Sequence, residues 1–380
     1  MPSIDAAVAD FLTAVEPIAD MSDPSDWLNG LRSLNRYAKD LGACARDAEP
    51  EELLRAAEQL IPVLAHADPQ VAGEASLTLG VFIENGLPPR VVGTALLEHF
   101  QKTLTLLKAF QDLVQQEVPE ADDKVEEEPG GYWVEERYVT AELAQNYLRQ
   151  DRRLPQAYAA LQNWYLPVVA ALSRDREFLR EAQQDKPLLR LVIELNIVFV
   201  TMLLRLLTGE TILVLHPETA KGFVIYIDNV IDNFQLHTLL ADALITECGL
   251  FRRKGPAWGI PGKRPSASVV ATMRGDGPRS IAEPSIGCWN LYNWTALDAN
   301  GCLPGKMEAG HWIWNEGVPA DILSFEGRRI ILLGPPSYHR GWNTALAIAS
   351  LKPVVEVREV LEKTAVWDWL KRLSTAKRET

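Results

Sequence analysis

The spacing of apolar residues changes near residue 210, and this change constrains the fold more than any other feature of the chain. Upstream, apolar residues recur at helical spacing in almost every segment. Residues 212–215 and 223–227 are instead β-branched and aromatic runs, joined by a connection that contains Pro217 and Gly222. They predict an antiparallel hairpin. Because both runs are apolar on both faces, both faces of the sheet should be covered.

The chain therefore divides into two parts, and its 380 residues exceed what one hydrophobic core usually holds. We expect a mainly helical domain over 1–208, either a bundle or a short α-solenoid. A smaller mixed domain with an antiparallel sheet should follow over 209–380, with glycine- and proline-rich loops at 251–287. Helices followed by strands indicate the α+β class rather than alternating α/β.

Several elements are predicted in the mixed part. Residues 233–245 have the pattern of an amphipathic helix, and Glu326-Gly327 predicts a tight hairpin turn. Within the glycine- and proline-rich loops, 268–273 predicts one short element. Further strand-like runs are expected at 288–297, 311–315, 320–325, 328–333 and 354–360. A closing helix is expected at 364–373.

Proline and glycine mark helix limits in the first part of the chain. Gly42 predicts the end of one helix, and Pro167 predicts a kink or division in another. Residues 187–208 form the most apolar stretch, long enough to span a bilayer. A buried helix is the favoured interpretation because polar residues interrupt the stretch, namely Arg190, Glu194, Asn196 and Arg205.

One helical segment has a family resemblance. Asp68-Pro69-Gln70-Val71, followed by Ala75, Leu79 and Gly80, resembles the second helix of a HEAT or armadillo repeat. The resemblance is to one repeat within residues 51–100. It implies an α-solenoid-like surface, which usually binds other proteins, and it assigns no catalytic residue.

Charge and cysteine content narrow the class of function. A net charge of −13 disfavours a protein that binds the phosphate backbone of nucleic acids. The four cysteines form no CxxC pair, so neither a zinc knuckle nor a disulfide framework is predicted. A cytoplasmic location is the simplest interpretation of this cysteine content. The first residues include acids where a signal peptide needs bases. Residues 117–131 hold seven acids and one lysine, which predicts an exposed loop rather than a docking tail.

The first candidate site lies where the hairpin passes into the following helix. The standard catalytic signatures are absent, so no metal is predicted and the cofactor is unknown. Asp228, Asp232 and His237 offer two carboxylates and an imidazole, which can bind a ligand, hold a divalent metal or share acid–base work. The favoured alternative is structural: Asp232 and Gln235 form a capping box, and His237 is packed.

The second candidate site combines residues of 311–316 with residues of 338–342. His311, Glu316, His339 and Arg340 are the candidate catalytic residues. Flat aromatic surface for a ligand comes from Trp312, Trp314, Tyr338 and Trp342. Such a set fits an anionic or sugar-like small molecule. The favoured alternative is a tryptophan-rich core, because six of the eleven tryptophans lie between 258 and 342.

The third candidate is a basic group with Trp258 among its members: Arg252, Arg253, Lys254, Lys263 and Arg264. An anion pocket is one interpretation. A solvated loop, or a segment that forms internal salt bridges, is favoured in so acidic a chain.

These observations lead to three functional hypotheses. The first is a binding protein that contacts another protein through its helical domain, or a small molecule in the mixed domain, without nucleic acid or membrane partners. The second is an enzyme that acts on a small polar or anionic metabolite by acid–base chemistry. The third is an acidic inhibitor of a basic partner.

Overall fold

The computed structural model describes residues 3–20, 24–117, 150–246, 259–261, 263–306, 308–336 and 339–377. Internal packing divides the chain into two compact units, Met1–Leu204 and Arg205–Thr380, where 1–208 and 209–380 were expected. We call them unit 1 and unit 2. The predicted acidic loop lies outside the described residues, apart from Glu117.

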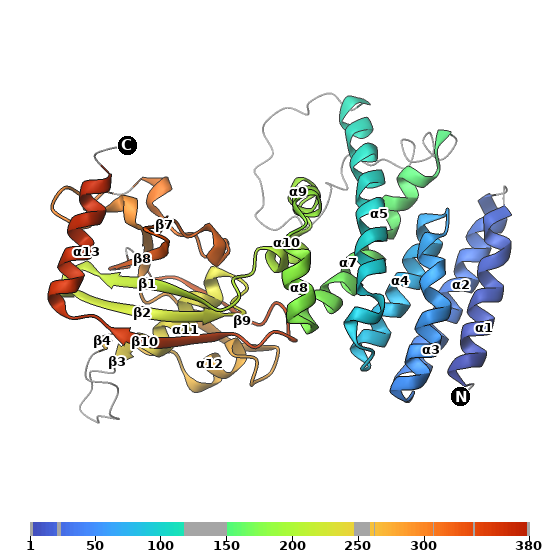
Figure 1. The fold of residues 1–380 in the computed structure, drawn as a ribbon, viewed down its shortest axis with the longest axis horizontal. Helices are drawn as coiled ribbons and strands as arrows, with labels where there is room; N and C mark the ends of the chain where they lie inside the picture. Colours follow the sequence, from blue (N-terminus) through green and yellow to red (C-terminus); the bar gives the residue numbers. More distant parts are fainter. Residues whose placement is uncertain are drawn as a thin grey trace. The chain divides into compact units, whose positions relative to one another are not determined.

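Unit 1 consists of helices (Figure 1). At its centre, α4 packs against α2 and α7, and α7 also packs against α5. The helices are α1 (Ile4–Val15), α2 (Pro24–Ala45), α3 (Pro50–Leu60), α4 (Pro69–Glu84), α5 (Pro89–Glu117), α7 (Arg153–Arg174), α8 (Arg176–Ala182), α9 (Lys186–Glu194) and α10 (Val198–Leu204). Helices α2, α4 and α5 each begin at a proline, which suits the first helical turn because the backbone N–H that proline lacks would have no partner there.

The helix end predicted at Gly42 is wrong, and of the two outcomes predicted at Pro167, a kink or a division, the division does not occur. Helix α2 continues through Gly42 to Ala45, and Gly42 lies against Val81 of α4. Helix α7 runs unbroken from Arg153 to Arg174 with Pro167 inside it. Pro167 packs onto Gly80, where an added Cβ would lie 2.8 Å from Pro167 Cγ. Close packing between the two helices compensates for the backbone bond that proline cannot donate.

The apolar stretch 187–208 does not form the single helix that was predicted. It contributes to α9 and α10, which are separated by Leu195, Asn196 and Ile197. Asn196 has a φ of 53°, a left-handed conformation that ends a helix and that asparagine tolerates better than most residues. Among the described residues, no helix is both long and apolar enough to cross a membrane.

Two acidic side chains of α4 connect it to its neighbours. Asp68 is 2% exposed and caps α4 by accepting from Gln70 N at 2.9 Å. It also accepts from Trp27 Nε1 at 2.7 Å and from Gln156 Nε2 at 3.0 Å. Further along α4, Glu74 accepts from the side-chain amides of Asn35 and Asn163. Both carboxylates therefore stabilise contacts among α2, α4 and α7.

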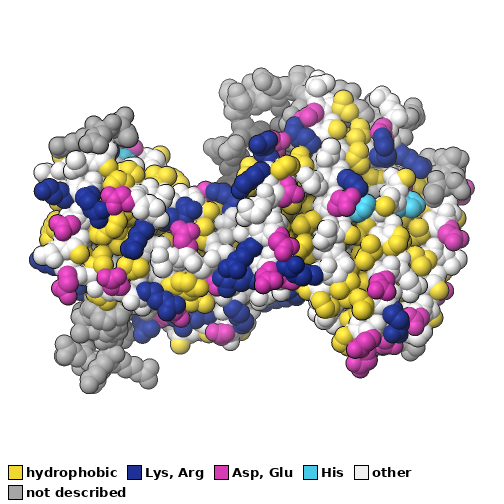
Figure 2. Space-filling model, viewed as in Figure 1, with side chains coloured by type: hydrophobic (Ala, Val, Ile, Leu, Met, Phe, Trp, Pro, Cys, Tyr) yellow, Lys and Arg dark blue, Asp and Glu magenta, His cyan; other side chains and the backbone are white. Residues whose placement is uncertain are grey.

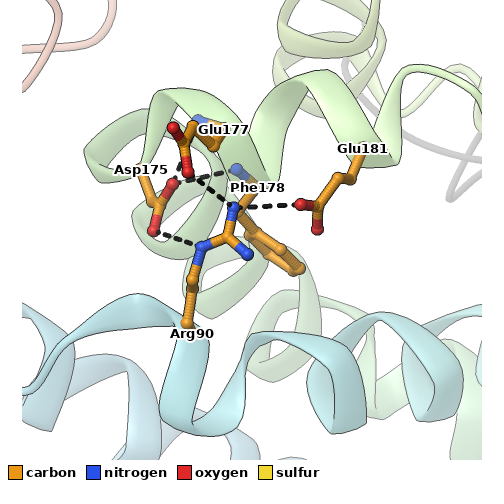
Figure 3. A network of polar contacts seen from close by, with 5 residues as sticks. All are labelled: Arg90, Asp175, Glu177, Phe178 and Glu181. Atoms are coloured by element: carbon orange, nitrogen blue, oxygen red, sulfur yellow. Dashed lines mark hydrogen bonds and ion pairs between the residues drawn. The ribbon is translucent and has the colours of Figure 1, made fainter.

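A surface network of charges joins α5 to the start of α8 (Figure 3). The guanidinium of Arg90 contacts Asp175, Glu177 and Glu181 at 3.1, 3.5 and 3.1 Å. Asp175 also caps α8 by accepting from Phe178 N at 2.9 Å. The Phe178 ring packs against Gly93, where an added Cβ would lie 2.7 Å away.

Unit 2 is built on a mixed sheet of strand order β10-β2-β1-β8-β6, and its α+β class is confirmed (Figure 1). The strands are β1 (Glu210–His216), β2 (Lys221–Asp228), β6 (Asn290–Asn293), β8 (Arg328–Gly334) and β10 (Val354–Val360). The predicted antiparallel hairpin is β1 and β2, while β1 and β8 pair in parallel. Short β7 (Ser324–Phe325) pairs with β8 through the predicted turn, in which Glu326 and Gly327 have positive φ.

Both faces of this sheet are covered, as predicted. Ile212 and Val214 point to a core that they share with α11 (Asn233–Leu244). Leu213 and Leu215 point to a second core, shared with α13 (Lys363–Ala376). Alternate residues of a strand face opposite sides, so two apolar faces on one hairpin need two layers of helix.

Several shorter elements complete unit 2. The element predicted at 268–273 is α12 (Ala267–Met273). Beside it, β5 (Ser280–Ile286) pairs with β9 (Gly341–Ala345), while β3 (Ile245–Thr246) pairs with β4 (Ile260–Pro261). The strand predicted at 311–315 is wrong, since only Trp312 forms a bridge, with Tyr292. The strand predicted at 320–325 is reduced to β7, because Pro319 begins a 3-10 turn at Pro319–Asp321.

Candidate functional site

The first predicted group has mainly structural contacts. Asp232 is the N-cap of α11 and accepts from Gln235 N at 2.7 Å. Burial raises the pKa of the Asp232 carboxyl to about 6, against the effect of its backbone hydrogen bonds. The Gln235 side chain accepts from Ile231 N, one residue before the N-cap nitrogen of a standard capping box. Asp228 is buried at the end of β2.

His237 lies inside the core of unit 2, with no exposed surface. Its Nε2 accepts a hydrogen bond from Cys288 N at 3.0 Å, and its ring contacts Trp289 and Trp342. Burial, aided by the charge of Arg340, lowers the pKa of His237 to about 3. The imidazole is therefore neutral at physiological pH and holds the backbone before β6 in place.

The second predicted group is separated by the main sheet. Trp342 packs against the core on the α11 side, whereas Trp312 packs against the core on the α13 side. Trp314 is 60% exposed, and the centroid of its ring lies 6.3 Å from the centroid of the Trp312 ring. Trp312 and Trp342 therefore lie on opposite sides of the main sheet, so the structure does not bring these two rings together.

The polar and charged residues of that group each contact a different part of unit 2. His311 accepts from Glu308 N within its own 3-10 turn, and Glu316 is exposed. Arg340 donates to Trp289 O at 3.0 Å. His339 is exposed and lines a cavity of which neither His311 nor Glu316 is part. Tyr338 lies outside the described residues.

That cavity is the best candidate site in unit 2. Its volume is about 1260 Å³, and it lies between α12, β5 and the end of α11. Apolar side chains form part of its wall, chiefly Ile245, Val269, Val270, Ile286 and Pro284. Its charged lining residues are Asp242, Lys263, Arg264, Arg274, Asp276 and Glu283, together with His339.

One end of the cavity contains a group of three charged residues. Asp242 of α11 is 8% exposed and accepts from Arg264 Nε at 2.8 Å. The Nη2 atoms of Arg264 and Arg274 each lie 2.7 Å from an oxygen of Asp242. We call these three residues the Arg264–Asp242–Arg274 cluster. With two guanidiniums and one carboxylate it carries a net charge of +1.

Glu283 lies at the other end of α12, where it accepts a hydrogen bond from a serine hydroxyl. Ser268 Oγ donates to Glu283 at 2.7 Å and lies 2.9 Å from Ser266 Oγ, which caps α12. Hydrogen bonds from Ser268 and Ser266 lower the pKa of Glu283. Glu283 is thus a carboxylate at neutral pH.

Cys288 contributes a thiol to the cavity wall. Burial raises the pKa of this thiol to about 11, although the nearby Lys263 acts against the shift. The Cys288 thiol donates a hydrogen bond to Lys263 O, with 3.4 Å between Sγ and O. A thiol in this state is protonated at neutral pH and is a weak nucleophile.

Two residues of this site were predicted as members of the basic group. Lys263 and Arg264 belong to the predicted basic group, whose members Arg252, Arg253 and Lys254 lie outside the described residues. Asp242, Arg274 and Glu283 were missed. A usable signal existed for Asp242, because a carboxylate within the apolar stretch 239–245 needs a cationic partner when buried.

Comparisons with protein-family models, curated proteins and solved structures found no match. Within the described residues, no group of three or more His, Cys, Asp or Glu side chains is placed to hold a metal ion. On the face drawn in Figure 2, acidic and basic side chains are interspersed over both units. The geometry of the cavity is therefore the basis for a functional proposal.

Proposed function

We propose that unit 2 is a binding module for a small amphipathic molecule, held in the cavity beside α12. The supporting observation is the cavity itself, about 1260 Å³ with an apolar wall and charged groups at both ends of α12. Small-molecule sites are typically apolar hollows of roughly 300–1,000 Å³ with a few polar groups that fix the orientation of the ligand. The cavity fits that description in its lining, and its volume lies somewhat above that range.

Cys288 and His237 are the two side chains that most resemble a nucleophile and its base, and their state favours binding without chemical change. The raised pKa of Cys288 keeps its thiol protonated, and His237 is fully buried with Nε2 engaged by a backbone amide. A general base must reach the proton that it removes. Neither side chain meets the requirements of an activated nucleophile and its base.

The experiment is a titration of the full chain with 1-anilinonaphthalene-8-sulfonate, an amphipathic anion whose fluorescence rises in apolar surroundings. Ala271 is half-buried in the cavity wall, so the indole of Ala271→Trp should project into the cavity and weaken probe binding at least about tenfold. Ala309→Trp is the matched control, because Ala309 is exposed and does not line the cavity. Equal probe affinity in wild type and Ala271→Trp would remove the cavity as the site.

An enzyme in the same cavity is a second candidate, favoured by one observation: His339 and Cys288 both line it. Alkylation with iodoacetamide at pH 7.5 separates the two proposals. The exposed Cys302 is an internal reference. The binding proposal expects Cys288 to react far more slowly than Cys302, whereas faster reaction at Cys288 would indicate an activated thiol.

A further inference from the structure

We propose that the Arg264–Asp242–Arg274 cluster is an anion subsite, which recognises a carboxylate or phosphate group on an otherwise apolar ligand. This inference rests on the proposed binding function and specifies the class of ligand. It assigns the head group of the ligand to the two arginines and the apolar tail to the wall of α12 and β5.

The cluster is organised before any ligand arrives. Asp242 Oδ1 bonds Arg264 Nε and Nη2, and Asp242 Oδ2 bonds Arg274 Nη2. The two arginines belong to different segments: one precedes α12 and the other is its C-cap. A fixed carboxylate between them limits the orientations of both guanidiniums, which lowers the entropy lost when they bind an anion.

Burial is unequal within the cluster, and this asymmetry favours an external anion. The Asp242 side chain is 8% exposed, whereas those of Arg264 and Arg274 are 43% and 45% exposed. The acid is thus enclosed while the bases face open space. A guanidinium has five N–H donors in a planar fork, so each arginine can bond Asp242 and a second carboxylate or phosphate.

Two hollows meet at the cluster. Asp242, Ile245, Arg264 and Arg274 line both the 1260 Å³ cavity and a second hollow of about 420 Å³. The second hollow is bounded by Val355, Glu356 and Val357 of the edge strand β10. A head group at the cluster is therefore reachable from either side, and its tail can lie along Val269, Val270 and Ile286 in the larger cavity.

Charged side chains lie at both ends of α12. Arg274 caps the C-terminal end, while Glu283 is held at the N-terminal end through Ser268. The seven residues of the helix separate these ends by about 10 Å at roughly 1.5 Å per residue. Lys263 acts on Glu283 at one end and Asp276 follows Arg274 at the other, so the attraction of an anionic head to the cluster rests on the free donors of the two exposed arginines.

The test compares three probes with one alkyl chain, namely 1-decanol, decanoate and decyl phosphate, by calorimetric titration of the full chain at pH 7.5. Wild type should bind at least one of the two anions about tenfold or more tighter than decanol. The better anion distinguishes a carboxylate from a phosphate ligand. Arg274→Met keeps the apolar stem of the side chain and should reduce the preference to about threefold or less, with decanol affinity unchanged.

Two further variants keep the result interpretable. Arg279→Met is the charge-matched control, since Arg279 is exposed and outside the cavity lining, and it should leave the preference intact. Asp242→Asn removes the competing carboxylate charge and should increase the preference for the anions. This variant still responds if Arg274→Met folds poorly.

Equal affinity for decanol and both anions in wild type would overturn the anion subsite and leave the proposed binding function intact. An anion preference that survives in both Arg274→Met and Arg264→Met would also overturn it. If no probe binds and 1-anilinonaphthalene-8-sulfonate does not bind either, the proposed function itself fails.

Discussion

The two units contain buried aspartates of similar exposure that have different surroundings. In unit 1, Asp68 is 2% exposed, and its partners are one backbone amide and the neutral side chains Trp27 and Gln156. In unit 2, Asp242 is 8% exposed, and its partners are two arginines that are nearly half exposed beside a cavity. The hydrogen bonds of Asp68 all end inside the helical unit, while the charge of Asp242 is shared with groups that face open space.

This difference separates a structural polar group from one suited to recognition. A carboxylate whose acceptors are all used by neutral donors within the core has nothing left to offer a ligand. A carboxylate that fixes exposed cations leaves their remaining donors accessible. We expect substitutions at the first kind to affect stability and substitutions at the second kind to affect binding.

The largest expected effect on stability is that of Asp68→Ala in unit 1. The change removes a helix cap and leaves the donors of Trp27 and Gln156 without their carboxylate acceptor, so it should destabilise the chain by about 3 kcal/mol. Asp185→Ala is the control, because Asp185 caps α9 through one backbone bond to Leu188 N and should cost about 1 kcal/mol. Urea denaturation followed by tryptophan fluorescence measures both. Equal losses would contradict the role given to Asp68.

The next effect concerns His237 and depends on pH. The pKa of His237 is about 3 in the folded chain and about 6.5 in the unfolded chain. Between these values the unfolded state takes up a proton that the folded state does not, so the free energy of unfolding falls as the pH falls from about 6.5 towards 3. At pH 5, relative to pH 8, this site should account for about 2 kcal/mol of the loss.

His237→Gln should remove that contribution, because glutamine does not titrate and offers an amide oxygen in place of Nε2. His339→Gln is the control, since His339 is exposed. Denaturation at pH 8 and pH 5 gives the comparison. If His237→Gln loses as much stability between the two pH values as wild type does, His237 is not a buried neutral imidazole.

A smaller effect tests the close contact between α4 and α7. Gly80→Ala places a Cβ 2.8 Å from Pro167 Cγ, which should cost about 1–2 kcal/mol through overpacking. Gly42→Ala is the matched control: its Cβ would meet Val81 Cγ1 at 3.6 Å, an ordinary contact, and alanine should add about 0.5–1 kcal/mol of helix stability. We expect the two substitutions to change the free energy of unfolding in opposite directions. Stabilisation by both would mean that α4 and α7 lie further apart than in this structure.

The smallest effect is expected at the surface network of unit 1. Arg90 is exposed between Asp175, Glu177 and Glu181, where water and salt screen its ion pairs. Arg90→Gln should shift the denaturation midpoint slightly at low salt and leave it unchanged at about 1 M NaCl. A large shift that persists at high salt would mean that this network stabilises unit 1 in the way Asp68 does.

Much of the fold of unit 2 was predictable because its signals are local. Two apolar faces on residues 212–227 required a covered sheet, Glu326-Gly327 required a turn, and Asp232 required a helix start; the structure contains each of them. The predicted strand at 311–315 failed because its alternation, with Ile313 and Asn315 buried and Trp314 exposed, accompanies a single bridge from Trp312 to Tyr292 and no continuous ladder. Pattern alone does not distinguish these cases.

The cavity was harder to predict because its residues meet only through tertiary structure. Arg264 and Arg274 lie 22 and 32 positions from Asp242, and the three belong to different segments. Trp312 and Trp342 were predicted to share one site, yet they pack against cores on opposite faces of the main sheet. Short-range spacing cannot show which face of a sheet a loop residue will join.

A crystal structure of the full chain grown with decanoate would locate the ligand site directly. We expect the alkyl chain to lie against Val269, Val270 and Ile286, with its carboxylate at hydrogen-bond distance from Arg264 or Arg274. Decanoate bound elsewhere, with ordered water filling the cavity, would contradict the assignment of this cavity as the ligand site.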